Sequence, residues 1–243
     1  MTRRTETDPL ASVPRTARRF LCRLRGKRLV HFLHVGKTGG TAVKHALREA
    51  PSRRYVVCLH PHHVRLRHVP PGDGVFFFLR DPVRRFVSGF YSRQRQGIPR
   101  GHFPWMPEEG VAFSRFATPA ALALGLSSND PAEKDAAERA MRSIRHVKSR
   151  YRDWFGDERY FLSRAADILL VGRQETLARD FERLKSLLDL PAHLALPRDA
   201  VESHRNPIDL DVTLDDAARA NLERWYQEDY RFLALCEERF GLD

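Results

Sequence analysis

Residues 29–42 read LVHFLHVGKTGGTA and decide the fold that we expect for this chain. A short apolar run rich in β-forming residues predicts a buried strand that ends at Gly36. A glycine-containing loop follows, and residues 42–50 have the apolar spacing of a helix. A loop between a strand and a helix N-terminus directs backbone N–H groups at one point, where the helix dipole favours an anion. We therefore predict a phosphate site in this loop.

The side chains of the loop suit an anion as well. Lys37 adds a positive charge, Thr38 and Thr41 add hydroxyl donors, and two glycines let a ligand approach the backbone closely. The loop is not a Walker A motif, because that motif needs glycine where His31 stands and places its lysine after the glycines. The alternative is an ordinary turn in which Thr41 is the helix N-cap.

Length and charge limit the function classes. A chain of 243 residues suits one α/β domain with a sizeable core. The net charge of +11 indicates an anionic partner. The arginines are spread over the expected helices and do not form one stripe with interleaved aromatic residues. This leaves two options, a nucleic acid or a phosphorylated cofactor together with an acidic glycan, and the spread of the arginines disfavours the nucleic acid.

Cysteine spacing and hydropathy predict the compartment. The cysteines are Cys22, Cys58 and Cys236. No pair has CxxC spacing, which favours a reducing compartment over a disulfide framework or a zinc site. No apolar run is long enough for a transmembrane segment, although peripheral membrane contact is compatible with the sequence. We expect a cytoplasmic protein of unpredicted oligomeric state, with a basic, flexible tail over residues 1–27 and one domain over residues 28–243.

Strands alternate with helices along the rest of the chain. The further expected strands are residues 54–59, 75–79 and 168–172, and the expected helices are residues 82–91, 113–124, 131–147, 176–188 and 214–240. This alternation predicts an α/β, P-loop-like, three-layer fold with a central, mainly parallel sheet flanked by helices. Residues 97–109 are irregular and rich in proline and aromatic residues, which is typical of an acceptor-binding lid.

A second anion site is expected where the strand 75–79 ends. Arg80 follows this strand directly, Asp81 and Pro82 begin a helix, and Ser88 comes two helical turns later. An arginine fork and a serine hydroxyl can hold one phosphate together. The alternative is that Arg80 and Asp81 form an ion pair at a helix cap and that Ser88 is a solvated residue.

Together, residues 37–42 and 78–91 resemble the carbohydrate sulfotransferases that use 3'-phosphoadenosine-5'-phosphosulfate (PAPS). The resemblance is closest to the branch of the heparan-sulfate 2-O-sulfotransferases and their bacterial relatives, sulfotransferase family 2. Residues 171–177 and the final tyrosine-rich helix are also similar, so the resemblance covers residues 28–240. It implies in-line transfer of a sulfuryl group from PAPS to a hydroxyl of a carbohydrate or glycoconjugate.

The resemblance also implies roles for individual residues. Lys37 would contact the 5'-phosphate and the bridging oxygen and stabilise the charge that develops there. The residues that would surround the 5'-phosphate are Thr38, Gly39, Gly40, Thr41 and Ala42. Arg80 and Ser88 would hold the 3'-phosphate, and residues 204–207 would form a late loop near the cofactor. No metal is required, because Lys37, Arg80 and the loop amides supply positive charge.

An acceptor hydroxyl needs a general base, for which histidine is the usual choice. Residues 60–64 read HPHHV, where the heparan-type enzymes have His-Gly-His-Val between the two cofactor sites. The spacing departs by one residue, so His63 and His62 remain nearly equal choices, with His60 behind them. The alternative is that these loop histidines have no role. A metal site is less favoured, because no cysteine or paired carboxylate completes it.

Two other function classes remain open at this point. A P-loop kinase using Mg-ATP is the first, because Asp81 after an apolar strand imitates a Walker B motif and Lys37-Thr38 imitates a P-loop. A non-enzymatic module that binds an anionic glycan or a nucleic acid through the net positive charge is the second.

Overall fold

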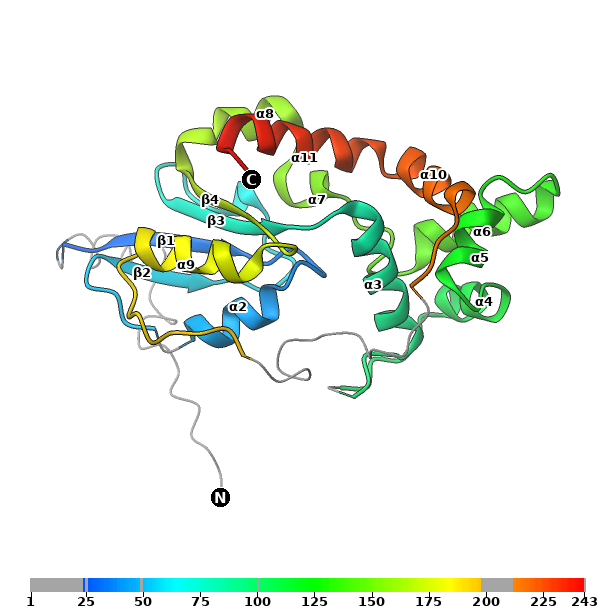
Figure 1. Cartoon of the computed structure of the whole chain (residues 1–243), viewed down its shortest axis with the longest axis horizontal. Coiled ribbons are helices and arrows are strands. Elements are labelled where there is room, and N and C mark those ends of the chain that lie inside the picture. Colours follow the sequence, from blue (N-terminus) through cyan, green and yellow to red (C-terminus); the bar gives the residue numbers. More distant parts are fainter. Residues whose placement is uncertain (1–23, 25, 49, 100, 198–211, 243) are drawn as a thin grey trace, which may run out of the picture.

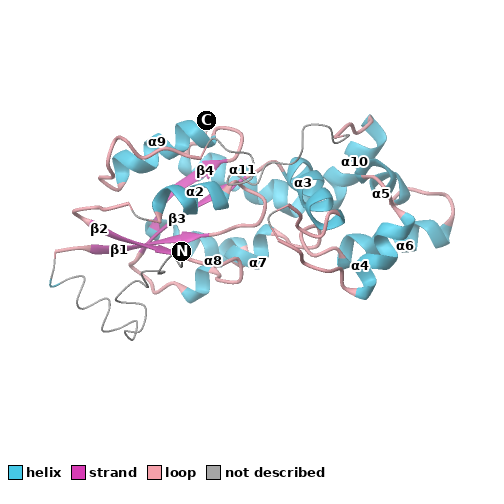
Figure 2. Ribbon diagram, turned by 90° about the horizontal axis from the view of Figure 1, so that it is seen from below, coloured by secondary structure: helices cyan, strands magenta, loops and turns pink. Residues whose placement is uncertain are grey.

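The computed structural model describes residues 24, 26–48, 50–99, 101–197 and 212–242. The loop expected at residues 204–207, and nearly all of the expected basic tail, lie outside the described residues. Within these ranges the chain forms a sheet with helices on both faces and a second group of helices beyond one end of the sheet (Figures 1 and 2). The expected α/β fold is confirmed.

Four parallel strands form the sheet in the order β2-β1-β3-β4. The strands are β1 (Arg28–Leu33), β2 (Tyr55–Leu59), β3 (Gly74–Leu79) and β4 (Ile168–Arg173). After β2 has paired with one side of β1, the chain crosses to β3 on the other side. The order of the strands therefore reverses between β1 and β3, which is where open parallel sheets bind their ligands.

The strand β3 shows why this sheet is covered on both faces. Its side chains alternate, so Phe76 and Phe78 enter one core cluster while Phe77 and Leu79 enter another. The first face is covered by α2 (Gly40–Leu47) and α9 (Leu177–Leu187). The other face is covered by α7 (Tyr151–Phe155), α8 (Glu158–Ser163) and α11 (Gln227–Phe240). This explains the uninterrupted apolar run that the sequence shows at residues 75–79.

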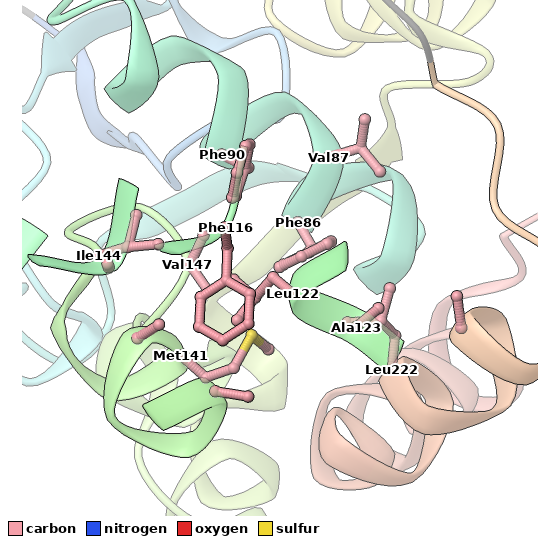
Figure 3. Close-up of a cluster of buried hydrophobic side chains, with 14 of the residues drawn as sticks. Phe86, Val87, Phe90, Phe116, Leu122, Ala123, Met141, Ile144, Val147 and Leu222 are labelled. Atoms are coloured by element: carbon pink, nitrogen blue, oxygen red, sulfur yellow. The ribbon is translucent and has the colours of Figure 1, made fainter. Parts of the chain in front are cut away.

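The remaining helices build a third core cluster (Figure 3). They are α3 (Pro82–Gln94), α4 (Pro107–Arg115), α5 (Pro119–Gly125), α6 (Pro131–Ser143) and α10 (Asp216–Trp225). Phe86 and Phe90 of α3 pack there against Leu122 of α5, Met141 of α6 and Leu222 of α10. Because α3 begins at the end of β3, it connects this helical group directly to the sheet.

Several expected element boundaries were wrong. The helix expected at residues 113–124 is two helices, because Pro119 begins α5 and the Thr118 hydroxyl accepts from the Ala121 N–H as its cap. The helix expected at residues 214–240 ends and restarts at Tyr226. The irregular segment expected to reach Glu109 ends earlier, because α4 begins at Pro107. The short helices α7 and α8 and the 3₁₀ turns were not predicted at all.

Two further observations concern the cysteines and the length of the helices. Cys58 and Cys236 are both buried, and neither forms a disulfide with another described cysteine. Among the helices that the structure describes, none combines the length and the apolarity that crossing a bilayer requires.

Candidate active site

The loop from β1 to α2 forms a tight turn at the end of the central strand. Lys37 has a φ of 69° and Gly39 a φ of 82°, so both adopt left-handed conformations. The Thr38 hydroxyl donates to the carbonyl oxygen of Val35 at 3.0 Å, which commits that hydroxyl to the turn. Gly39 is the N-cap of α2, and Thr41 lies inside the helix. The alternative in which Thr41 caps an ordinary helix is therefore wrong.

Position 40 has to be glycine, because the ring of His34 lies against it. A Cβ at position 40 would lie 2.2 Å from Cδ2 of His34, far inside van der Waals contact. The His34 ring cannot retreat easily, because it stacks on Phe32 on one side and lies 3.7 Å, centroid to centroid, from the ring of His62. The absence of a side chain at Gly40 thus lets the start of α2 approach the histidines.

The Gly40→Ala variant tests this close approach. We expect it to lower the free energy of unfolding by about 1–3 kcal/mol, because overpacking displaces the His34 ring and the helix start. Gly110→Ala is the matched control, since a Cβ at position 110 of α4 meets no atom within 4 Å and alanine favours a helix by up to about 1 kcal/mol. Urea unfolding of both variants measures the difference; equal stability of the two would contradict the close approach.

The two expected anion sites meet at the switch between β1 and β3. Arg80 Nη1 donates to the carbonyl oxygen of Lys37 at 3.3 Å. The Nε of Arg80 is buried and has no hydrogen-bond partner among the described residues. Burial, followed by the positive charges of Arg80 and Arg95, lowers the pKa of Lys37 to about 8. The structure therefore places two cationic residues side by side. An anion could accept the hydrogen bond that the buried Arg80 Nε lacks.

The backbone at Arg80 is held by side chains that sequence reasoning missed. The hydroxyl of Tyr151 on α7 accepts the Arg80 N–H at 3.0 Å and donates to the Arg80 carbonyl. The next N–H, of Asp81, donates to Glu175 Oε1 at 2.9 Å. Both partners lie far along the chain from Arg80, so no local spacing could reveal them. They orient the arginine at the end of β3.

Asp81 acts as a helix cap. Its Oδ1 accepts the Arg84 N–H at 2.8 Å at the start of α3, and its Oδ2 accepts from the Tyr230 hydroxyl at 2.9 Å. The helix cap predicted from Asp81-Pro82 is confirmed. The alternative, an ion pair between Asp81 and Arg80, is wrong, because the carboxylate bonds to the Arg84 N–H and to the Tyr230 hydroxyl instead. Both oxygens are engaged, which leaves little for the metal-binding role that a Walker B aspartate would need.

Ser88 lies in the second turn of α3 and is buried. The alternative of a solvated serine is therefore wrong. Its neighbour Gly89 makes room for His146, since a Cβ at position 89 would lie 3.0 Å from the Cβ of His146. The Nδ1 of the same histidine lies 3.9 Å from an ideal Cβ at Gly36. The second turn of α3, His146 and the β1–α2 loop therefore lie together.

His146 was not predicted, because it follows α6 without any motif. Burial, then the charges of Lys37 and of neighbouring groups that include His62, lower its pKa to about 3. It is therefore neutral at pH 7, and its side chain lies between Gly36 of the β1–α2 loop and Gly89 of α3. Only the folding of the segment after α6 back onto Gly89 brings it there.

The loop histidines at residues 60–63 separate in the structure. His62 Nδ1 lies 3.1 Å from the His34 carbonyl oxygen, and the Trp154 indole N–H donates to the His62 carbonyl at 2.9 Å. Partial desolvation and the charges of Lys44, Lys37 and Arg145 lower the pKa of His62, against the opposing effect of the His34 bond. His60 Nε2 instead lies 2.8 Å from His31 Nδ1, in a chain that continues to Asp73.

His62 and His63 are both exposed by surface area, and no hydrogen bond of the His63 side chain is found within the described ranges. As for metals, the described part of the chain contains no grouping of three His, Cys, Asp or Glu side chains that could hold an ion.

The segment expected to act as a lid, residues 97–109, lies between α3 and α4 and includes the first residues of α4. Its anchor is a buried ion pair in which Arg93 Nη2 lies 2.5 Å from Glu109 Oε2. Burial alone would raise the pKa of Glu109, yet hydrogen bonds from Arg93, Arg145 and Met106 lower it to about 2. Arg95 in the same loop is close enough to Lys37 to act on its pKa.

Comparison with known proteins agrees with this geometry. The model of the sulfotransferase family matches residues 22–234, which is most of the chain. A comparison with curated proteins found no match.

Proposed function

This chain belongs to the sulfotransferase family, and on that basis we propose that it transfers a sulfuryl group from PAPS to a hydroxyl of a carbohydrate or glycoconjugate. The observation that carries the proposal is the pairing of Lys37 with Arg80 between β1 and β3. Two half-buried cations at a strand switch suit a nucleotide that has anionic groups at both ends of its ribose. The kinase alternative is disfavoured by the family and by the capping role of Asp81.

The residues at the site fit such a donor. The buried Arg80 Nε lacks a partner in the described part of the chain, and a phosphate oxygen would satisfy it. The N–H groups at the start of α2 would bind the 5'-phosphate, with Lys37 beside the bridging oxygen. Arg80 and Ser88 would bind the 3'-phosphate. When bound, PAPS supplies an activated sulfuryl group on a good leaving group.

His62 is the general base that the geometry favours. A carbonyl oxygen only accepts hydrogen bonds, so the contact with the His34 carbonyl places a proton on Nδ1 of His62. In the neutral ring the lone pair then lies on Nε2, which can take the proton of an acceptor hydroxyl. The charges of Lys37 and Lys44 act on this ring, which places it beside the anion site. Proton removal from the hydroxyl would accompany its in-line attack, while Lys37 stabilises the charge on the departing phosphate.

Two matched substitutions test the base. We expect His62→Asn to lower kcat by about 10²–10⁴-fold, because asparagine can keep the bond to the His34 carbonyl but cannot take a proton. His63→Asn, at the exposed neighbouring histidine, should change kcat by less than about threefold. Steady-state kinetics with saturating donor distinguishes the two. A large loss of kcat in His63→Asn, with little change in His62→Asn, would assign the base to His63. If kcat is unchanged in both variants, neither histidine is the base.

Ligand-induced thermal shift tests the donor site directly. Adenosine 3',5'-bisphosphate at 100 times its Kd stabilises the folded state by about 2.7 kcal/mol, which for a chain of this size raises Tm by about 5–10 °C. We expect this shift without magnesium, and we expect its loss in Arg80→Ala. Stabilisation by Mg-ATP instead would favour a kinase. No response to either nucleotide, with binding of anionic glycans that weakens steeply with salt, would favour a binding module.

The acceptor and the compartment are also part of the proposal. A carbohydrate or glycolipid hydroxyl is the substrate that we propose, and mass spectrometry of candidate glycans incubated with enzyme and PAPS would detect a sulfate added to the product. We also propose a cytoplasmic location, because no pair of cysteines in the sequence has CxxC spacing.

A further inference from the structure

Exposed apolar side chains concentrate beside the site. Of the large hydrophobic residues that are exposed in the described chain, five fall within residues 98–111. They are Ile98, Phe103, Trp105, Met106 and Val111, and we call this set the apolar patch. Single exposed apolar residues are ordinary, whereas a contiguous group marks an interaction surface.

The patch stands on a rigid support. Arg93, which forms the buried ion pair with Glu109, also donates to the carbonyl oxygens of Phe103 at 3.1 Å and Pro104 at 3.2 Å. The Trp105 indole N–H donates to the Arg93 carbonyl at 2.7 Å. These bonds hold the backbone of the loop. The Trp105 ring packs against Phe113 of the core, at 5.1 Å between centroids, whereas Phe103 and Met106 stay 57% and 61% exposed. Their exposure is therefore a property of the fold.

The protruding side chains of the patch favour a partner with a broad surface. Met106 is 61% exposed and Val111 is 71% exposed, so both protrude from the surface and do not line a groove. The helix α4 lies at the lower edge of the helical group, away from the sheet (Figure 1). Protruding apolar side chains with a tryptophan among them suit the boundary between lipid headgroups and acyl chains.

The charge around the patch fits an anionic surface. Arg115 is exposed one turn beyond Val111 on α4. Arg145 and Lys148 are exposed after α6, and the Arg145 backbone N–H donates to Glu109 at 2.9 Å, which places this segment beside the start of α4. Glu108 is the exposed acid on the same helix. The three cations outweigh it, in keeping with the net charge of +11.

We propose that the apolar patch docks this protein on an anionic lipid bilayer, with Phe103, Met106 and Val111 inserted below the headgroups. Arg115, Arg145 and Lys148 then face the lipid phosphates. Because the Arg145 N–H donates to Glu109 at the start of α4, and the next residue, His146, lies against Gly36, docking brings the β1–α2 loop close to the membrane surface. Under the proposed function this position gives access to a lipid-linked acceptor; the docking itself does not depend on the reaction.

Sedimentation of the full chain with vesicles tests the proposal. We expect binding to phosphatidylglycerol-containing vesicles, little binding to pure phosphatidylcholine, and weaker binding as salt rises. The double variant Met106→Ser/Val111→Ser should bind at least about tenfold less tightly. The matched control Leu162→Ser/Leu187→Ser changes exposed leucines on α8 and α9 and should bind as the wild type does.

Three results would overturn docking by the patch. Absence of binding to anionic vesicles at low salt is the first. Equal binding by the two double variants is the second, since charge alone would then account for it. The third is a wild-type dimer that the Met106/Val111 double variant dissociates while its vesicle binding stays unchanged. The apolar patch would then bind a second copy of the chain and not a membrane. Val111→Ser alone repeats the comparison should the double variant unfold. Bisphosphate-induced thermal shift, measured in parallel, reports on the proposed function separately.

Discussion

Replacing Lys37 by alanine is expected to lower kcat for sulfuryl transfer by at least about 10²-fold, the scale of losing one donor to a developing oxyanion. The turn holds Lys37 in a left-handed conformation, and Arg80 bonds to its carbonyl oxygen, so the residue has a defined position. Its buried ammonium lies next to other cations and gains most when an anion arrives. Single-turnover assays with PAPS measure the loss, and full activity of the variant would refute the assignment of the site.

The pH profile separates the charge of Lys37 from its shape. Because burial and two arginines lower its pKa to about 8, the lysine is charged at pH 7 and loses its proton as the pH rises through 8. We therefore expect kcat/KM, which reports the free enzyme, to fall toward alkaline pH by up to tenfold per unit. Lys37→Arg stays charged throughout this range and should lose the alkaline limb even if its maximal rate is lower. A limb that persists in the arginine variant would belong to another group.

Replacing Asp229 by alanine is expected to lower the free energy of unfolding by about 3–5 kcal/mol, because it leaves Arg85 as an uncompensated buried charge. Arg85 Nη2 lies 3.2 Å from Asp229 Oδ2, and both side chains are almost fully buried. The other carboxylate oxygen accepts the Tyr151 N–H at 2.6 Å. Urea unfolding measures the loss. Its magnitude is large because the Arg85 guanidinium, which keeps its bond to the Ser149 carbonyl, loses its counter-charge away from water, and the Tyr151 N–H loses its acceptor.

A surface pair provides the control for Asp229. Asp135 and Arg139 pair across one turn of α6 and are both well exposed, so Asp135→Ala should cost less than about 1 kcal/mol. A second effect distinguishes Asp229 further. It holds Tyr151, whose hydroxyl holds the backbone of Arg80, so bisphosphate binding should weaken even where the variant remains folded. A loss of stability no larger than that of the control would contradict the buried-pair argument.

Much of this site could be predicted because its parts are local in sequence. The turn at Lys37, the helix start at Pro82 and the apolar strand before Arg80 each follow from neighbouring residues, whose propensities act over a few positions. The positions of Thr38 and Thr41 could not be predicted in the same way. Whether a hydroxyl faces a ligand or its own backbone depends on the torsion angles of the turn, and several arrangements share one sequence pattern.

The choice among the histidines shows where local information ends. His60, His62 and His63 have nearly the same sequence context. In the structure, however, His60 contacts His31, whereas the His62 ring lies 3.7 Å, centroid to centroid, from the His34 ring. His146 carried no signal at all, because it reaches Gly36 and Gly89 only after α6 has packed against its neighbours. Spacing along the chain says nothing about such contacts.

The sequence by itself determined the alternation of strands and helices, the strand ends that carry Lys37 and Arg80, and the excess of positive charge. Only the tertiary structure decided which strands are neighbours, and therefore that these two cations share one site. It also decided that Tyr151 and Asp229 support Arg80 and that the loop after α3 keeps its apolar side chains outside. The physical reason is that propensity and periodicity act over a few residues, whereas packing, burial and ion pairing join residues that the chain separates widely.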